Sequence, residues 1–400
     1  MDQQSFEDQI TRRQFLRAAM ALGGTVVGAP LLGGCFPREL ETATPSPMPS
    51  ATTKPLVGLE ATSTPTPVPM ATMKPSVGLE ATSTPTPAPS PTTSPTPIPP
   101  QEKLTSQVAL VKTSHRAEGV MTALDLLGIN PAQGKAVFLK PNFNSADPAP
   151  GSTHKDTLSS LVKALWEMGA REITLAERSG MGDTNQVMRE KGIFQMAEEL
   201  NFSVINLDEL GEDGWVHVRP QNSHWRDGFL FARPCLEAEC VVQTCCLKTH
   251  RFGGHFTLSL KNSVALVPRH GYNFMGELHS SPYQRLMIAE LNEPYSPDLI
   301  VLDGIEAFTD GGPDRGTKVR AEVMLAGTDR VAVDAVGVAI LRHLGTTPQV
   351  SRGPIFEQEQ IARAVELALG VSSPDEIQVV TGDEESEKYA QVIRDALARG

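Results

Sequence analysis

A proline-rich stretch with an internal repeat divides the chain and limits where a packed fold can form. Residues 51–70 read ATTKPLVGLEATSTPTPVPM, and residues 71–90 read ATMKPSVGLEATSTPTPAPS. The surrounding segment is dominated by Pro, Ser, Thr and Ala, so it buries too little apolar surface to offset the entropy of ordering its backbone. We therefore predict a disordered linker over residues 36–101, followed by one globular domain over residues 102–400.

The segment before the linker, residues 1–35, has the pattern of an export signal. Arg12 and Arg13 precede an apolar stretch rich in Ala, Gly, Leu and Val, which resembles a twin-arginine signal. The stretch ends in LGGC, which resembles a lipobox with Cys35 as the lipid-carrying cysteine. A transmembrane anchor is the alternative, but the segment is glycine-rich and short for a span. The sequence predicts export by the twin-arginine machinery and a lipid anchor at the outer face of the cytoplasmic membrane.

From residue 107 onward, short apolar segments alternate with segments of helical periodicity. Strands are predicted at 107–112, 135–140, 172–176, 203–207, 240–246, 299–302 and 323–326, and helices at 157–168 and 187–200. Repeated strand–helix–strand units predict an α/β fold with a largely parallel central sheet and helices on both faces. In such sheets ligands bind outside the carboxyl ends of the strands.

Polar clusters follow several of these strands. They are KPN at 140–142, ERSG at 177–180, KTH at 248–250, DG at 303–304 and TDGGP at 309–313. A single polar loop is weak evidence, because loops are ordinarily polar, but several at one edge would converge in space. The residues that we assign to substrate binding are Lys140, Asn142, Glu177, Thr249, Asn262, Gly311, Gly312 and Asp334. For Asp334, a second role is equally open, as the start of a helix whose dipole favours a carboxylate.

The segment between Glu239 and Glu277 is basic, although the chain carries a net charge of −12. It contains no acid, and Lys248, Lys261 and several histidines lie within it. Hydroxyl residues alternate with Leu258 and Leu260 before Lys261, which predicts a strand with Lys261 on the hydroxyl face. Two lysines at one edge suit a carboxylate or phosphate, and partial burial lowers the pKa of a lysine enough for acid–base or covalent chemistry. A solvated basic face is the alternative.

The acidic balance also excludes one class of partner. A nucleic-acid-binding protein needs an extended cationic face, and no long basic run occurs in this chain. We therefore expect a small anionic ligand and a membrane partner, and no nucleic acid.

Together these motifs resemble a recognised family, the domain of unknown function family number 362. The resemblance covers about residues 107–345, and its marks are KPN at 140–142, KTH at 248–250, TLSLKN at 257–262, His279 in ELHSS, DGI at 303–305, GGP at 311–313 and GTDRVAVDAVG at 327–337. It implies an α/β fold and a shared pocket, and it carries no agreed activity. Some members look joined to ferredoxin-type iron–sulfur modules, whose closely spaced four-cysteine run this chain lacks.

The cysteines and histidines leave the cofactor unknown. Four cysteines follow the spacing C-x4-C-x4-C-C, which is no zinc or ferredoxin pattern, and structural thiols are favoured. A disulfide between Cys235 and Cys240 stays open. A divalent metal also stays open, because five residues offer suitable atoms without a compact motif: His250, His255, His270, His279 and Asp303.

Two classes of function follow. In the first, the protein is an enzyme that acts on an anionic small molecule, with catalytic roles for Lys248, His250, Lys261, His279 and Asp303. In the second, it is a tethered protein that captures a small anion for a membrane partner. Two lobes that close through hinge strands would indicate the binding protein. One rigid sheet with a pocket lined by Lys248, Lys261 and Asp303 would indicate the enzyme.

Overall fold

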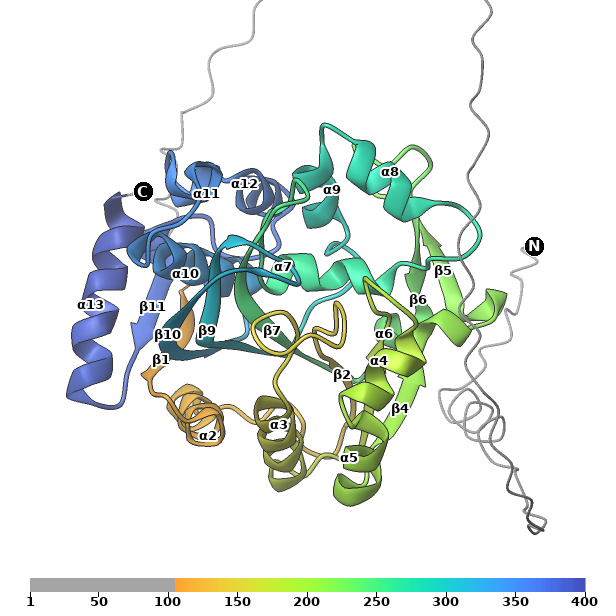
Figure 1. The fold of residues 1–400 in the computed structure, drawn as a ribbon, viewed down its shortest axis with the longest axis horizontal. Helices are drawn as coiled ribbons and strands as arrows, with labels where there is room; N and C mark the ends of the chain where they lie inside the picture. The colour runs from red at the N-terminus through yellow and green to blue at the C-terminus, as the bar shows by residue number, and fades with distance from the viewer. Residues whose placement is uncertain (1–104, 400) are drawn as a thin grey trace, which may run out of the picture. The chain divides into compact units, whose positions relative to one another are not determined.

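The computed structural model describes residues 105–399, which are built around one mixed sheet of nine strands (Figure 1). In spatial order the strands are β11 (Ile377–Val380), β1 (Ser106–Lys112), β10 (Gly316–Gly327), β9 (Leu299–Gly311), β7 (Cys240–His250), β2 (Ala136–Lys140), β3 (Glu172–Glu177) and β4 (Ser203–Asn206), and β8 (His255–Thr257) pairs with the end of β7. In this order every pair is parallel except the two pairs that β10 makes. The predicted α/β fold with a largely parallel sheet is confirmed.

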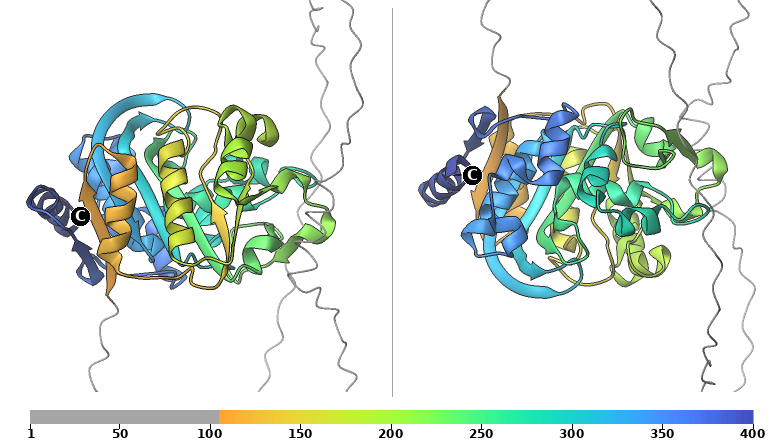
Figure 2. Two further views of the ribbon diagram at one scale, coloured as in Figure 1. Left: turned by 90° about the horizontal axis from the view of Figure 1, so that it is seen from below. Right: turned by 90° about the horizontal axis from the view of Figure 1, so that it is seen from above.

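Helices cover both faces of this sheet (Figure 2). One face carries α2 (Arg116–Leu127), α3 (Lys155–Glu167), α4 (Thr184–Glu190) and α5 (Ile193–Leu200). The other face carries α7 (Ser259–Asn262), α8 (Phe274–Ser280), α9 (Gln284–Glu290), α10 (Arg330–His343), α11 (Pro348–Ser351) and α12 (Glu359–Glu366). The last helix, α13 (Glu384–Arg399), packs against α10 and β1, and a separate hairpin of β5 (Trp215–Val218) and β6 (Phe229–Ala232) leads into α6 (Arg233–Leu236).

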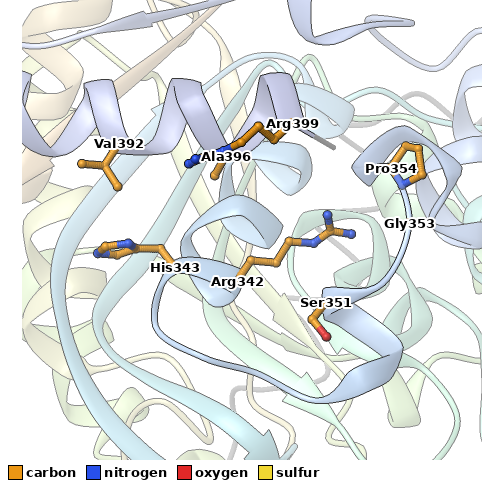
Figure 3. Close-up of a pocket in the computed structure, with 8 residues that line it drawn as sticks. All are labelled: Arg342, His343, Ser351, Gly353, Pro354, Val392, Ala396 and Arg399. Carbon is orange, nitrogen blue, oxygen red and sulfur yellow. The ribbon is translucent and has the colours of Figure 1, made fainter.

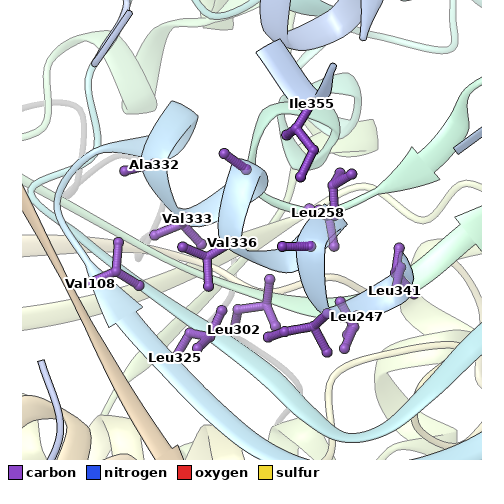
Figure 4. Packing of buried hydrophobic residues seen from close by; sticks show 14 of the residues in the cluster. Val108, Leu247, Leu258, Leu302, Leu325, Ala332, Val333, Val336, Leu341 and Ile355 are labelled. Atoms are coloured by element: carbon purple, nitrogen blue, oxygen red, sulfur yellow. The ribbon is translucent and has the colours of Figure 1, made fainter. Parts of the chain in front are cut away.

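The core is centred on α10, which is buried along almost its whole length. Its residues Val333 and Val336 pack towards Leu302 of β9 and Leu325 of β10, and Leu341 belongs to the same apolar cluster (Figure 4). A helix that is apolar on nearly all sides is stable only when it is surrounded, because each buried Val or Leu contributes roughly 1.5–3 kcal/mol. The position of α10 is therefore fixed by its composition, and this matters for the site described below.

Several predicted elements differ in detail from the structure. The predicted helix over 187–200 is two helices, α4 and α5, which Lys191 and Gly192 separate; Gly192 has a φ of 69°. The predicted strand through Lys261 is wrong, because β8 ends at Thr257 and α7 begins at Ser259. Strands β7 and β9 run on to His250 and Gly311, beyond the segments predicted for them.

Export and anchoring are predicted from a part of the chain that lies outside residues 105–399. This applies to Arg12, Arg13 and Cys35 and to the predicted linker over 36–101. Within the described residues, no helix combines the length and the apolar character needed to cross a membrane.

The turn that joins β9 to β10 folds back onto the end of β7. The amide of Arg251 donates to the carbonyl of Gly312 at 3.3 Å, and the amide of Gly312 donates to the carbonyl of Arg315 at 2.7 Å. Gly312 has a φ of 63°, and a Cβ added there would lie 2.0 Å from the carbonyl oxygen of Thr249. Only glycine allows this contact, which brings Pro313 to the mouth of the site.

We expect Gly312→Ala to destabilise the protein more than a matched glycine substitution elsewhere. Gly345 also has a positive φ, 80°, but nothing lies within 4 Å of an added Cβ. Gly345→Ala should lose about 1 kcal/mol through left-handed strain alone, and Gly312→Ala about 1–3 kcal/mol more, because its methyl group overlaps a carbonyl oxygen. Urea unfolding of both variants measures the difference. Equal losses would contradict the packing of this turn on β7.

Candidate functional site

A small cavity lies at the carboxyl ends of β2, β3 and β7, the edge at which the sequence predicts a site. Its volume is about 50 Å³, enough for a few waters or part of a small ligand. Five predicted residues line it, and they come from segments far apart in the chain: Asn142, Glu177, Lys248, Lys261 and Asn262. The predicted convergence of strand ends therefore holds for these residues.

Asn262 joins the elements that surround the cavity. Its side-chain amide donates to Gln243 Oε1 at 3.2 Å and to the carbonyl of Thr244 at 3.3 Å, both on β7. Its oxygen accepts from Lys140 Nζ and from Asn142 Nδ2, each at 3.4 Å. Because Asn262 is buried and both ends of its amide are used, it is a connector between α7, β2 and β7.

Lys140 and Glu177 form a buried ion pair beside Asn262. The ammonium of Lys140 lies 2.7 Å from Glu177 Oε1, and both side chains are at most 2% exposed. The carboxylate also accepts from the amides of Arg178 and Phe143, at 2.8 and 2.7 Å. Burial lowers the pKa of Lys140 and the Glu177 charge opposes that shift. The pair is neutral as a whole, and both oxygens of the Glu177 carboxylate already accept hydrogen bonds. We therefore assign the pair a structural role beside the cavity.

Lys248 is fully buried and is held by oxygens alone. Its ammonium donates to Asn142 Oδ1 at 2.9 Å, to the carbonyl of Gly151, and to the carbonyl of Pro313 at 3.4 Å. Three acceptors use all three N–H donors of a lysine. Burial lowers the pKa of Lys248, and no carboxylate pairs with it. Its charge therefore contributes to the potential inside the cavity while its hydrogens are occupied.

The position of Lys261 depends on a carboxylate from α10. Asp334 is fully buried and accepts from the amides of Ser259 at 2.7 Å and Leu260 at 3.1 Å. Those amides are the free donors at the start of α7, so Asp334 caps that helix from outside. The prediction that Asp334 begins a helix is wrong, because Asp329 caps α10 and Asp334 lies within it. Burial raises the pKa of Asp334 to about 8, and the two amide hydrogen bonds act in the opposite direction.

Lys261 differs from the other two lysines because no acceptor meets its ammonium among residues 105–399. It lines the cavity and is partly buried, close to Gly254, where an added Cβ would lie 2.9 Å from both Lys261 Cε and His250 Nδ1. Burial lowers the pKa of Lys261 to about 7, and the positive charges of Lys248 and Arg178 add to the effect. A lysine that changes protonation near neutral pH in a cavity can hold an anion or exchange a proton.

Among the cavity residues to which the sequence analysis gave no site role, three are polar and have a side chain: Asn144, Arg178 and Thr257. Each has a buried polar atom without a partner, namely Asn144 Nδ2, Arg178 Nε and Thr257 Oγ1. Such atoms are rare in folded proteins, and a ligand is one of the things that satisfies them. Burial lowers the pKa of Arg178 to about 10, while its terminal nitrogens are held by Val264 and Ser179 carbonyls. The sequence could have indicated Arg178, because it directly follows Glu177 in the polar cluster ERSG at 177–180.

Other predicted residues lie outside the lining. Asp303 accepts from Arg116 Nε at 2.8 Å and Thr157 Oγ1 at 2.6 Å, so its carboxylate is used under α2 and α3. Thr249 donates to the carbonyl of Phe308 at 3.2 Å, and Gly312 packs closely against the carbonyl oxygen of Thr249. Asp303, Thr249 and Gly311 are not among the residues that line the cavity, so the prediction that Asp303 lines a pocket with Lys248 is wrong.

Of the two histidines predicted as catalytic, His250 lies next to Lys261, and His279 interacts with Lys261 electrostatically. Burial lowers the pKa of His250 well below its usual value, and the charges of Lys261 and His279 act in the same direction. His250 Nδ1 accepts from the amide of Gly254 at 3.3 Å. His279, on α8, is exposed, and its Nδ1–H donates to the carbonyl of Met275 at 2.7 Å; partial desolvation lowers its pKa too. Both are neutral groups that can move a proton near the lysine.

Histidines, acids and thiols do not gather into a metal site in the part of the chain that the structure describes. No group of three or more His, Cys, Asp and Glu there is arranged to hold a metal. His270 lies 3.9 Å from Asp208, and His255 lies near Arg285 and Glu359, both apart from the cavity lining. The thiols of Cys235, Cys245 and Cys246 are buried and free, Cys240 is also buried, and burial raises the pKa of Cys246 to about 11.

A larger cavity, about 490 Å³, lies between the end of α10 and α13 (Figure 3). Arg342, His343 and Arg399 line it, and no predicted site residue does. Arg342 donates to the carbonyls of Val350 at 2.8 Å and Arg352 at 3.3 Å. Arg342 therefore holds the segment that follows α10. The small cavity is the better candidate for a ligand site, because buried donors without a partner line it.

Comparison with known proteins gives two matches. The model of the family described as "Domain of unknown function (DUF362)" matches residues 137–339. This segment contains all the residues that line the small cavity with Lys248 and Lys261. The thylakoid-associated protein sll1697 of Synechocystis sp. is similar to this chain, with 23% identity over 259 residues, which cover 62% of this chain and 75% of the relative.

Lys248 and Lys261 should respond in opposite ways to replacement by methionine. Lys248→Met leaves three neutral oxygens without their donor, and we expect a loss of about 1–3 kcal/mol for each oxygen that stays buried without a partner. Lys261→Met removes a charge that has no partner, so it should stabilise the protein at pH 6. The unfolded chain binds more protons than the folded chain between a pKa of about 7 and about 10.4, so the stability of the native protein rises with pH over that window.

Urea unfolding of both variants and the native protein between pH 6 and pH 10 measures these effects. The advantage of Lys261→Met should be largest below pH 7 and should disappear towards pH 10. A destabilised Lys261→Met variant at pH 6 would mean that the ammonium has a partner in the folded protein.

Proposed function

Since the chain belongs to the DUF362 family, whose matched segment spans the whole cavity, we propose that this cavity is the active site of an enzyme that acts on a small anionic molecule. In this proposal Lys261 is the charged group that meets the substrate and exchanges a proton with it. The observation that carries the proposal is the Lys261 ammonium, which has no acceptor among residues 105–399, whereas Lys248 in the same cavity and Lys140 behind it are fully engaged by the fold.

The charges around the cavity support an anionic ligand. Lys140 and Glu177 cancel each other, whereas Lys248, Arg178 and Lys261 have no carboxylate as a hydrogen-bond partner. Three positive charges in a partly buried site attract an anion more strongly than the same charges in water, because the local dielectric is lower. An anion would also accept from the free Arg178 Nε and Asn144 Nδ2.

The arrangement of the sheet favours catalysis over capture. A capture protein of the hinged kind has two lobes, whereas the cavity here lies on one edge of a single sheet in residues 105–399. Two neutral histidines beside Lys261 also supply proton acceptors that simple binding does not need. The small volume of the cavity supports the alternative, in which a small anion is bound without turnover.

We further propose that the protein is exported through the twin-arginine route and anchored by lipid at Cys35 to the outer face of the cytoplasmic membrane. The sequence of residues 1–35 supports this proposal. The name of the Synechocystis relative, which describes it as thylakoid-associated, agrees with a membrane location.

Anion binding should depend on the charge of Lys261. Because an anion favours the protonated lysine, the affinity for phosphate or acetate should fall about tenfold per pH unit above pH 7. Lys261→Met should bind at least about tenfold more weakly at pH 6, and Lys261→Arg should bind without this pH dependence. Titration followed by NMR or calorimetry measures these affinities, with Lys163→Met, an exposed lysine on α3, as the control.

The Lys261→Arg variant separates the two functions. Once a substrate is identified from co-purifying small molecules, this variant should retain binding and lose turnover by at least about a hundredfold, the usual contribution of a general acid or base. Full turnover by Lys261→Arg would exclude proton exchange by this residue. Equal binding by Lys261→Met and the native protein would exclude the cavity as the anion site.

Export and anchoring have separate variants. Replacement of Arg12 and Arg13 by lysine should leave the protein inside the cell, and Cys35→Ser should release it from the membrane fraction after export. Cell fractionation and mass spectrometry of the mature N-terminus measure both outcomes. Membrane retention of a processed Cys35→Ser protein would contradict the lipid anchor.

A further inference from the structure

Lys261 is a primary amine at the wall of a cavity, and nothing among residues 105–399 occupies its hydrogens or balances its charge. Resting on the proposed function, we propose that the substrate is a small 2-oxo acid, whose carbonyl carbon forms an imine with the Lys261 amine. This substrate class follows from two features of the cavity: the amine of Lys261 and the buried donors Arg178 Nε and Asn144 Nδ2.

The donors for the carboxylate of such a molecule are already in place. Arg178 Nε and Asn144 Nδ2 are buried, line the same cavity as Lys261, and lack an acceptor. Gly180 keeps this space open, because an added Cβ would lie 2.4 Å from Asn144 Oδ1. A carboxylate has lone pairs for both donors, and its neighbouring carbonyl group would then lie within the same small volume as the amine.

The surroundings of Lys261 favour the neutral amine that attacks a carbonyl. Lys248 and His250 face it from β7, Arg178 follows β3, and His279 comes from α8. None of these groups is negative, and the Glu177 carboxylate in the same cavity is paired with Lys140. Cations nearby and partial burial lower the pKa of Lys261 to about 7, so much of it is unprotonated at neutral pH. Lysines that form imines are activated in this way.

The reaction needs no oxidant and no further reactant. The Lys261 nitrogen bonds to the carbonyl carbon, and the carbonyl oxygen leaves as water after it takes two protons. One proton comes from the lysine nitrogen, which keeps its second hydrogen, and one comes from a neighbouring acid. The product is therefore the protonated imine, the iminium ion, which makes the adjacent carbon of the substrate acidic.

The two histidines are placed to move these protons. His250 lies against Lys261 across Gly254, where a side chain would collide with both. The amide of Gly254 donates to His250 Nδ1, which leaves the proton of the neutral ring on Nε2. His279 is exposed and interacts electrostatically with Lys261, so it can exchange protons with water. Both histidines are positioning or proton-carrying groups, and the bond to the substrate is made by Lys261 alone.

Reductive trapping tests the imine. The full chain is incubated with pyruvate or glyoxylate and sodium cyanoborohydride, and peptides are mapped by mass spectrometry. We expect one dominant adduct at Lys261, at least about tenfold more abundant than at the exposed Lys163. Its yield should approach a plateau between pH 7 and pH 8, whereas trapping at Lys163 should still be rising there, because an ordinary lysine has a pKa of about 10.4.

Lys261→Arg and lactate supply the controls. Lys261→Arg should bind pyruvate without trapping it, and Lys163→Arg should trap it as the native protein does. Lactate, which has no carbonyl group, should bind in competition with pyruvate and suppress the adduct. Competitive binding of pyruvate without an adduct at Lys261 overturns the imine and leaves the proposed anion site intact. If neither pyruvate nor lactate nor phosphate binds, the proposed function fails as well.

Discussion

A single buried carboxylate decides the geometry of the site. Asp334 emerges from the middle of α10 and accepts the first two amides of α7, at 2.7 and 3.1 Å. A helix of four residues has too few internal hydrogen bonds to hold itself together, so its start must be fixed from outside. Lys261 and Asn262 follow directly in that helix. The interior position of Asp334 is in turn set by the apolar packing of α10. The position of Lys261 therefore depends on the packing of the core.

The three lysines show how differently a buried ammonium group is accommodated. Lys140 has a carboxylate at 2.7 Å, and Lys248 has three neutral oxygens. Removal of either set of partners leaves an uncompensated charge, which costs about 3–5 kcal/mol in a protein interior. Lys261 has neither arrangement and its pKa falls to about 7. Lys261 therefore differs from the other two in having no hydrogen-bond acceptor for its ammonium among the described residues.

The sequence predicted the edge of the sheet at which the cavity lies. The polar clusters directly follow apolar strands, and the alternation of strands and helices along the chain predicts that those strands are parallel. Asn142, Glu177 and Lys248 are found there on this basis. The helical turn at Lys261 was not predictable, because its local alternation favours a strand and a carboxylate about 75 residues away overrides it. Asp303 failed for a related reason: its register on β9 turns it towards α2 and α3, and a one-residue difference in register changes the face.

The unpartnered atoms of the cavity carry a consequence for stability. Buried donors without an acceptor, such as Arg178 Nε and Asn144 Nδ2, lower the stability of the folded protein, since each unsatisfied donor costs about 1–3 kcal/mol. An anion that accepts from these groups would recover that free energy on binding. Asp334 and Asn262 hold α7 in place through hydrogen bonds that come from α10 and β7, independently of the side-chain donors that face the cavity. The position of Lys261 is therefore fixed by the fold itself.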